Sequence, residues 1–160
     1  MHKIFIGLGS NLKNPQQKIK SAIQLIQEID TVNLISQSSL YETPPIGFID
    51  QPHFINAVIE ISSPINFSDL LVNLLRVEED FGRIRMQKNG PRTLDLDILL
   101  FDDLVLNSQT LTIPHPRMHE RLFVLIPLLE ISPLLSMPNH GSISTLIANL
   151  PTQDIKRIDS

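Results

Sequence analysis

Two aspartates, Asp95 and Asp97, lie in a stretch where apolar and polar residues alternate, and they are the side chains best suited to chemistry. Leu94, Leu96 and Ile98 occupy the alternating positions, a period of two that predicts a strand with one buried face. The two carboxylates then share the other face, about 7 Å apart at Cα. They repel each other and resist loss of water unless a cation lies between them. Such hard oxygen ligands suit Mg²⁺, which completes its shell with water and substrate phosphates.

The alternative interpretation is a solvated strand edge that carries two charges, because short motifs often match by chance. Arg92, three residues before the first aspartate, favours a functional site, and Gly90 and Pro91 predict a turn ahead of it. Basic residues gather at 83–92 and 115–121. An otherwise acidic chain therefore carries a local site for an anion.

The composition is typical of one soluble globular domain, which we expect to span residues 1–160. Apolar residues make up 42% of the chain, and the net charge of −4 argues against a general binder of nucleic acid or of anionic membranes. The absence of cysteine excludes disulfides and thiolate metal sites and fits a reducing compartment. The N-terminal apolar run is too short for a signal peptide or a membrane span. We therefore expect a cytoplasmic protein.

Hydrophobic periodicity predicts the elements that position the aspartates. The order is strand, helix, strand, strand, helix, strand, with expected ranges 3–8, 15–29, 31–41, 53–62, 66–81 and 93–101. Asn14 is the expected N-cap of the first helix, and Gly82 the stop of the second. We interpret residues 7–11, Gly-Leu-Gly-Ser-Asn, as a strand-to-helix turn whose Ser10 and Asn11 face the site, because the lysine of a phosphate-binding loop is missing.

This order predicts an α+β protein with a ferredoxin-like βαββαβ core, an antiparallel sheet with helices on one face. Residues 43–47 form a stiff proline turn between two of its strands. Beyond the core, prolines divide the C-terminal part into a short strand at 104–107 and short helices at 117–130 and 142–149. We expect these helices to be an extension of the core.

The run from 88 to 99, Lys-Asn-Gly-Pro-Arg-Thr-Leu-Asp-Leu-Asp-Ile-Leu, resembles the signature of the 6-hydroxymethyl-7,8-dihydropterin pyrophosphokinase family. The resemblance extends across nearly the whole chain, in the family's order and spacing. It includes Gly9-Ser10-Asn11, the run from Tyr41 to Gly47, Phe54-Ile55-Asn56, Glu78 with Gly82-Arg83-Ile84-Arg85, and Pro114-His115 with Arg121 and Phe123. Seven motifs in register exclude chance.

The resemblance implies a diphosphotransferase that moves the terminal diphosphate of ATP to the hydroxymethyl group of the pterin and releases AMP, in tetrahydrofolate biosynthesis. ATP is then a co-substrate, and Asp95 and Asp97 hold two Mg²⁺ ions that bridge its phosphates. In-line displacement at phosphorus requires that negative charge be neutralised more than it requires covalent help. We expect a monomer that acts on these small molecules, with no nucleic-acid or membrane partner.

On the ATP side, the resemblance implies phosphate contacts from a set of basic residues and nucleotide contacts from three others. The basic residues are Arg83, Arg85, Arg92, His115 and Arg121, of which Arg83 and Arg92 join the aspartates as catalytic residues, and the others are Glu78, Ile98 and Thr112. Arginine suits bidentate phosphate binding. Taken alone, these side chains would be a solvated loop, a turn histidine and charges on helix surfaces.

On the pterin side, the resemblance implies Phe54 and Phe123 as aromatic plates and Asn56 as the reader of the ring edge. Thr43, Pro44, Ile46 and Gly47 contribute backbone groups. The alternative is that both phenylalanines belong to the core, the commoner fate of Phe.

The sequence departs from the family pattern where ATP would be covered. Residue 89 is Asn in place of Trp, Phe54 replaces the more usual Tyr, and Pro116 follows His115 where an aromatic residue is common. We expect residues 83–91 to form a mobile lid that orders over bound nucleotide. Two other functions fit the residues, a metal-dependent phosphohydrolase and a non-catalytic ferredoxin-like ligand-binding module.

Overall fold

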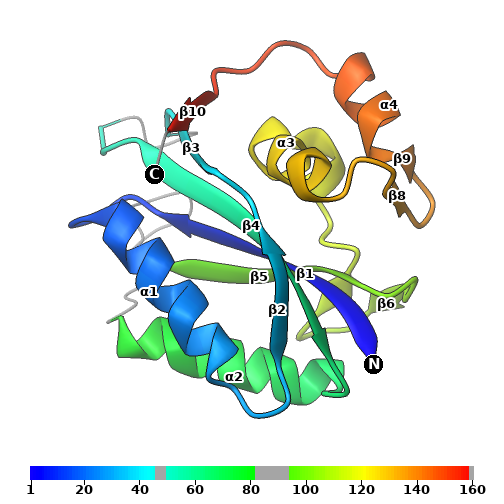
Figure 1. The fold of residues 1–160 in the computed structure, drawn as a ribbon. Coiled ribbons are helices and arrows are strands. Elements are labelled where there is room, and N and C mark those ends of the chain that lie inside the picture. The colour runs from blue at the N-terminus through cyan, green and yellow to red at the C-terminus, as the bar shows by residue number, and fades with distance from the viewer. Residues whose placement is uncertain (46–49, 82–93, 159–160) are drawn as a thin grey trace.

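The computed structural model describes residues 1–45, 50–81 and 94–158. The protein is built around a central antiparallel sheet. Its strands are β1 (His2–Ser10), β2 (Asn33–Gln37), β3 (Leu40–Thr43), β4 (Phe54–Ser63), β5 (Asp95–Phe101) and β10 (Lys156–Ile158). The order is β10-β3-β4-β1-β5, and β2 pairs with β4 beyond the end of β3 (Figure 1). Neighbours run antiparallel throughout, which confirms the ferredoxin-like core.

Two amphipathic helices cover one face of this sheet, α1 (Pro15–Gln27) and α2 (Phe67–Asp80) (Figure 1). Their apolar stripes pack on the inward residues of β1 and β4 and on Leu96 and Ile98 of β5. The side chain of Asn66 begins α2 by accepting the N–H of Asp69 at 2.9 Å. Asn14 also occupies the N-cap position of α1, but its backbone is left-handed (φ 55°) and its side chain makes no cap hydrogen bond. The predicted stop at Gly82 lies outside the described residues.

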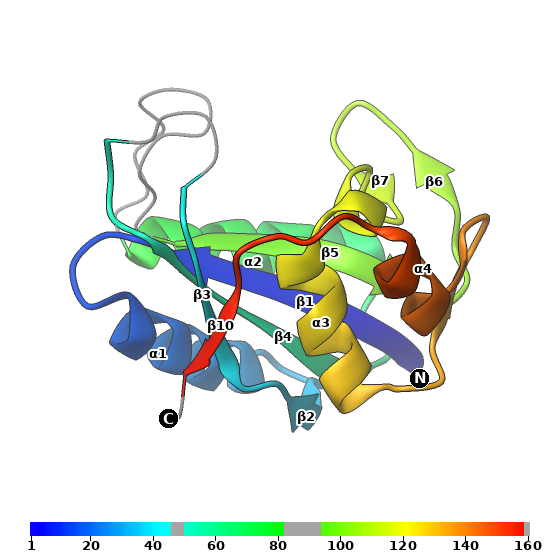
Figure 2. The same ribbon diagram turned by 90° about the horizontal axis from the view of Figure 1, so that it is seen from above.

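The opposite face is covered as well, by the helices of the C-terminal extension, while the two helices of the ferredoxin-like core lie on one face as expected. The helix α3 (Leu122–Ile131), with α4 (Ile143–Asn149) beside it, packs a second apolar cluster on Phe5, Val58 and Leu99 (Figure 2). Strands β1, β4 and β5 are thus buried on both faces, as their long apolar runs require. The C-terminal part therefore forms a third layer of the molecule.

Short elements join these layers. They are the 3₁₀ turn η1 (Met118–Glu120) and the hairpins β6 (Leu106–Asn107) with β7 (Thr112–Ile113) and β8 (Ser136–Met137) with β9 (Gly141–Ser142). The helix predicted over 117–130 divides into η1 and α3 because Arg121 between them is extended. The run at 31–41 likewise divides into β2 and β3. Among the described residues, no helix has the length and apolarity to cross a bilayer.

Candidate active site

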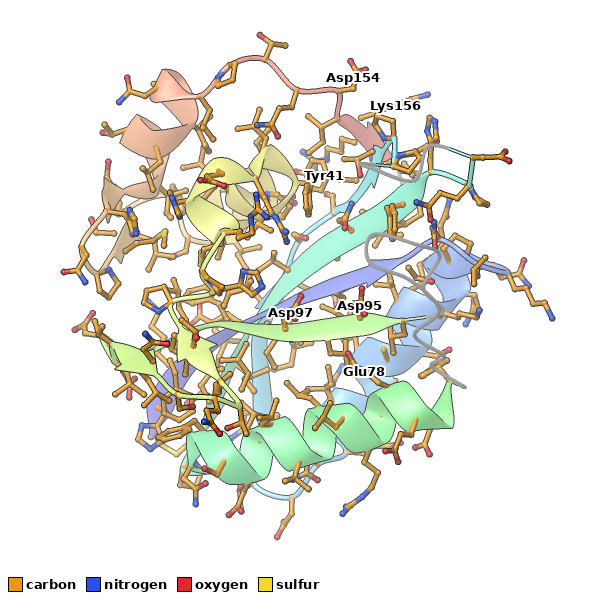
Figure 3. The ribbon with its side chains drawn as sticks, turned by 180° about the vertical axis from the view of Figure 1, so that it is seen from behind. Tyr41, Glu78, Asp95, Asp97, Asp154 and Lys156 are labelled. Carbon is orange, nitrogen blue, oxygen red and sulfur yellow. The ribbon has the colours of Figure 1, made fainter. Side chains whose placement is uncertain are left out.

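Asp95 and Asp97 lie on β5 opposite two glycines of β1, with Asp95 facing Gly9 and Asp97 facing Gly7. The glycine-rich residues are therefore part of β1, which continues to Ser10, and the interpretation as a turn was wrong. Figure 3 shows the two carboxylates side by side along β5, on the side away from α2. Because glycine has no side chain, the sheet beside the carboxylates is flat and open, which leaves space for ligands.

A cleft of about 430 Å³ lies over this part of the sheet, beneath the N-terminal end of α3. It brings together nine of the residues expected in the site, Thr43, Pro44, Phe54, Asn56, Asp95, Asp97, His115, Arg121 and Phe123. Carboxylates, cations and aromatic rings thus share one open space, although they come from β3, β4, β5 and the segment that leads into α3.

His115 and Arg121 form the basic side of the cleft. The backbone N–H of His115 donates to the carbonyl of Leu99 on β5 at 3.0 Å, and its Nδ1 accepts the N–H of Arg117 at 3.3 Å. Burial, together with the charges of Arg121 and Arg117, lowers the pKa of His115 to about 4, so the imidazole is neutral at pH 7. Burial and then Arg117 also lower the pKa of Arg121, against the opposing pull of Asp97. This concentration of positive charge favours an anionic ligand.

Asn56 and two phenylalanines form the other side of the cleft. Asn56 is 8% exposed, and its Nδ2 donates to Thr43 Oγ1 at 3.0 Å, which fixes the orientation of the amide. Phe54 and Phe123 are half-buried and line the cleft, and Phe123 also packs against the apolar cluster on this face of the sheet. The Arg121 guanidinium lies 5.5 Å from the ring centroid of Phe123, a cation–π contact. This side of the cleft therefore offers flat apolar surface from the two phenylalanines beside the amide of Asn56.

Comparison with known proteins identifies the family of this chain. The profile of the 7,8-dihydro-6-hydroxymethylpterin-pyrophosphokinase (HPPK) family matches residues 5–133. A 2-amino-4-hydroxy-6-hydroxymethyldihydropteridine pyrophosphokinase of Pseudomonas aeruginosa is 37% identical over 99% of this chain and 98% of its own. The chain belongs to the HPPK family. A protein of the same name from Haemophilus influenzae is 41% identical over 89% of each chain.

The fold of the HPPK chain has a counterpart among solved structures. A crystal structure described as HPPK-DHPS in complex with substrates superposes with a TM-score of 0.72 at 14% identity. The match covers 92% of this chain and 43% of that one, so the chain spans less than half of the fused protein. This likeness concerns the fold of the HPPK part.

Three residues that the family resemblance placed at the nucleotide lie away from the described cleft. Glu78 is 3% exposed, and its Oε2 accepts the backbone N–H of Leu96 at 2.7 Å, so the interpretation as a helix-surface charge was wrong (Figure 3). Ile98 points into the core beneath α1 and α2. Thr112 on β7 donates from Oγ1 to Asn107 Oδ1 at 3.4 Å. Glu78 instead binds the outer edge of the strand that carries both aspartates.

Other expectations fall where the chain is not described. Arg83, Arg85, Arg92, Ile46 and Gly47 lie outside the described residues, and so does the lid expected at 83–91. Ser10 and Asn11 are buried at the end of β1, where Asn11 Nδ2 donates to Gln51 Oε1 at 2.8 Å and to the carbonyl of Pro52 at 3.0 Å. Asn11 thus holds the segment before β4, and neither residue is among the described residues of the cleft.

Sequence reasoning missed several residues that line the HPPK cleft, namely Gly7, Arg117, Glu120 and Gln153. Two of them had a signal, because Arg117 and Glu120 lie within the basic cluster already noted at 115–121. They form an ion pair at 3.7 Å between Nε and Oε2. Gln153 carried no signal, since nothing near it in the sequence indicates that the C-terminal segment returns to α3.

Proposed function

We propose that this chain transfers the diphosphate of ATP to the hydroxymethyl group of 6-hydroxymethyl-7,8-dihydropterin and releases AMP, the activity for which its family is named. One observation carries the proposal. A single cleft joins a pair of strand carboxylates, a basic side and an aromatic side. The basic side is formed by His115 and Arg121, and the aromatic side by Phe54 and Phe123 beside Asn56. A transfer of diphosphate between ATP and a flat heterocycle requires these three environments next to each other.

Asp95 and Asp97 would hold Mg²⁺, and we propose two ions. The donor set fits, because both side chains offer hard carboxylate oxygens on one strand face, and the facing glycines leave space for water and phosphate. A metal held by these carboxylates would supply the positive charge that offsets the phosphate charge during the transfer. The chain itself contributes the rigid strand that fixes the spacing of the two carboxylates.

His115 and Arg121 bind the phosphates from the opposite side of the cleft. Arg121 presents a planar guanidinium, which suits bidentate contact with phosphate oxygens. His115 is neutral at pH 7, and because its Nδ1 accepts the N–H of Arg117, its Nε2 carries the proton and donates one hydrogen bond without adding charge. Arg83, Arg85 and Arg92 complete the phosphate contacts in this proposal, with Arg83 and Arg92 acting on the transferred group. Glu78 acts on the nucleotide side by holding β5. The side chain of Ile98 lies in the core, so in this proposal Ile98 contacts the nucleotide through its backbone, and Thr112 contacts it from β7.

Asn56 reads the edge of the pterin, while Phe54 and Phe123 stack on its faces. An amide presents donor and acceptor together, as the pterin edge does. Because the Nδ2–Thr43 hydrogen bond fixes the amide, recognition loses little side-chain entropy on binding. Pro44 and, in this proposal, Ile46 and Gly47 border the ring with backbone groups.

The test is incubation with ATP, Mg²⁺ and the hydroxymethyl dihydropterin, followed by separation of nucleotide and pterin products. We expect AMP and pterin diphosphate in equal amounts, with no reaction when the pterin is omitted. Phosphate released without pterin would indicate a phosphohydrolase, and binding without turnover a ligand-binding module. Either outcome would overturn the proposal.

We also propose that the chain acts as a single domain of residues 1–160 and as a monomer in the cytoplasm, where ATP is available. Support for the monomer is that one chain supplies all three environments of the cleft. Light scattering behind size-exclusion chromatography gives the mass directly. A dimer mass at catalytic concentrations would contradict the monomer.

A further inference from the structure

The junction between η1 and α3 exposes the backbone on both sides of Arg121. This residue is extended, with φ −116° and ψ 105°, so neither the 3₁₀ turn nor the helix continues through it. It occupies the N-cap position of α3 without a side-chain cap hydrogen bond. The first N–H groups of a helix have no partner within the helix. The N–H of Leu122 and the carbonyl of Glu120 therefore require partners from elsewhere in the molecule.

Gln153 supplies both partners with one side-chain amide. Its Oε1 accepts the N–H of Leu122 at 3.2 Å, and its Nε2 donates to the carbonyl of Glu120 at 3.2 Å. The amide thus binds the peptide groups that directly flank Arg121. An amide satisfies both sides, because it carries an acceptor oxygen for the N–H and a donor nitrogen for the carbonyl.

The segment that carries Gln153 is itself anchored to the sheet. Figure 2 shows the chain running from α4 across the N-terminal end of α3 to β10, which lies alongside β3. Strand β10 pairs with β3 from Lys156, opposite Glu42, to Ile158, opposite Leu40. Since β3 ends at Thr43 on the pterin side of the cleft, the segment connects the two sides of the site.

We propose that Gln153 is a positioning residue for Arg121, which holds its backbone so that the guanidinium faces the phosphate site beside Asp97. The inference deepens the proposed function and rests on it for the role of Arg121. Gln153 lies beyond the residues 5–133 that the family profile matches, yet it lines the cleft. A long side chain magnifies any change in the direction of its own backbone, and small misplacements at a reacting group reduce rates strongly.

The experiment is a double-mutant cycle with Gln153→Leu and Arg121→Ala, read as the dissociation constant of a non-hydrolysable ATP analogue with Mg²⁺ by calorimetry. Alone, Gln153→Leu is expected to weaken binding about tenfold. In the Arg121→Ala background, the same change is expected to alter binding less than about twofold, because Gln153 acts through Arg121. Thr152→Ala, at an exposed neighbouring position, is the matched control and should bind as the unaltered protein does.

Gln153→Glu provides a second variant of nearly equal size. It keeps the acceptor for Leu122 but places a carboxylate against the carbonyl of Glu120, so it should weaken analogue binding at least as much as Gln153→Leu. It also covers the case in which the leucine variant fails to fold. An unchanged dissociation constant in both variants, or an equal loss with and without Arg121, would overturn the proposal. If Gln153 and Arg121 are coupled in analogue binding but the unaltered protein produces no AMP, the proposed function is refuted and the positioning role of Gln153 is not.

Discussion

Replacing Gly9 with alanine should displace Asn56, because the added methyl group comes too close to the Asn56 side chain. Gly9 pairs with Asn56 on β4 and with Asp95 on β5, so it lies between these two residues on the sheet beneath the cleft. A Cβ built at Gly9 lies 3.1 Å from Asn56 Oδ1, closer than ordinary van der Waals contact of 3.4–4 Å. Gly9 lies in regular strand and is not among the described residues with positive φ, so the effect comes from the methyl group and not from backbone strain.

The size of the effect follows from what holds Asn56. The amide has to give way by a few tenths of an ångström, and it is held by its 3.0 Å hydrogen bond to Thr43. Weakening one buried hydrogen bond costs about 1 kcal/mol of stability, which lowers the melting midpoint of a chain of this size by about 3 °C. The same misalignment at the pterin edge should raise the pterin dissociation constant about fivefold.

Calorimetric titration with the hydroxymethyl dihydropterin and thermal unfolding measure the two effects on Gly9→Ala. Gly7→Ala is the matched control, because the three atoms nearest to a Cβ at Gly7 all belong to the side chain of Leu99, with Cδ2 at 3.3 Å, and none to Asn56. Leu99 is not among the residues proposed to contact the pterin, so pterin affinity should change less than about twofold. If Gly9→Ala binds pterin as tightly as the unaltered protein, Asn56 does not read the pterin edge in the way argued.

Three further changes test other parts of the site. Asp97→Asn removes a proposed metal ligand, so turnover should fall by about 100-fold or more. Because Asp97 is exposed on β5, the melting midpoint should change by less than about 2 °C. Near-normal turnover would contradict the catalytic role of Asp97. Because the pKa of His115 is about 4 when folded and 6.5 when unfolded, the unfolded state binds the proton first, and stability should fall as pH drops from 6.5 to 4. Urea titrations between pH 6.5 and 4 should show that the free energy of unfolding declines less with pH in His115→Asn than in the unaltered protein. An identical decline in both proteins would contradict the lowered pKa of His115. Tyr41→Phe loses the 2.7 Å hydrogen bond to Glu130 Oε1 and should lower the free energy of unfolding by about 2 kcal/mol, with turnover unchanged. A fall in turnover would show that Tyr41 takes part in the chemistry.

The core could be predicted from the sequence because its apolar periodicity is strong and local. The alternation through Leu94, Leu96 and Ile98 fixed the face on which Asp95 and Asp97 lie, and the structure confirms that face. The glycines of β1 were misjudged for a physical reason. Glycine is expected in turns, whereas here it pairs with the aspartates and keeps the sheet open, a constraint set by strands distant in sequence.

Long-range pairing also explains what the sequence could not indicate. Glu78 was interpreted as a surface charge, since nothing local shows that the outer edge of β5 needs a partner for the N–H of Leu96. Strand β10 was not predicted, because three residues carry no useful period. Gln153 is recognisable only once β10 pairs with β3 and brings the preceding segment onto α3.

The central claim is that Asp95 and Asp97 bind divalent metal together with the phosphates of ATP. A crystal structure with Mg²⁺, a non-hydrolysable ATP analogue and the hydroxymethyl dihydropterin tests it most directly. We predict metal density in contact with both carboxylates and with phosphate oxygens, and Asn56 at the pterin edge. Phosphates bound elsewhere, with no metal at the aspartates, would contradict the account.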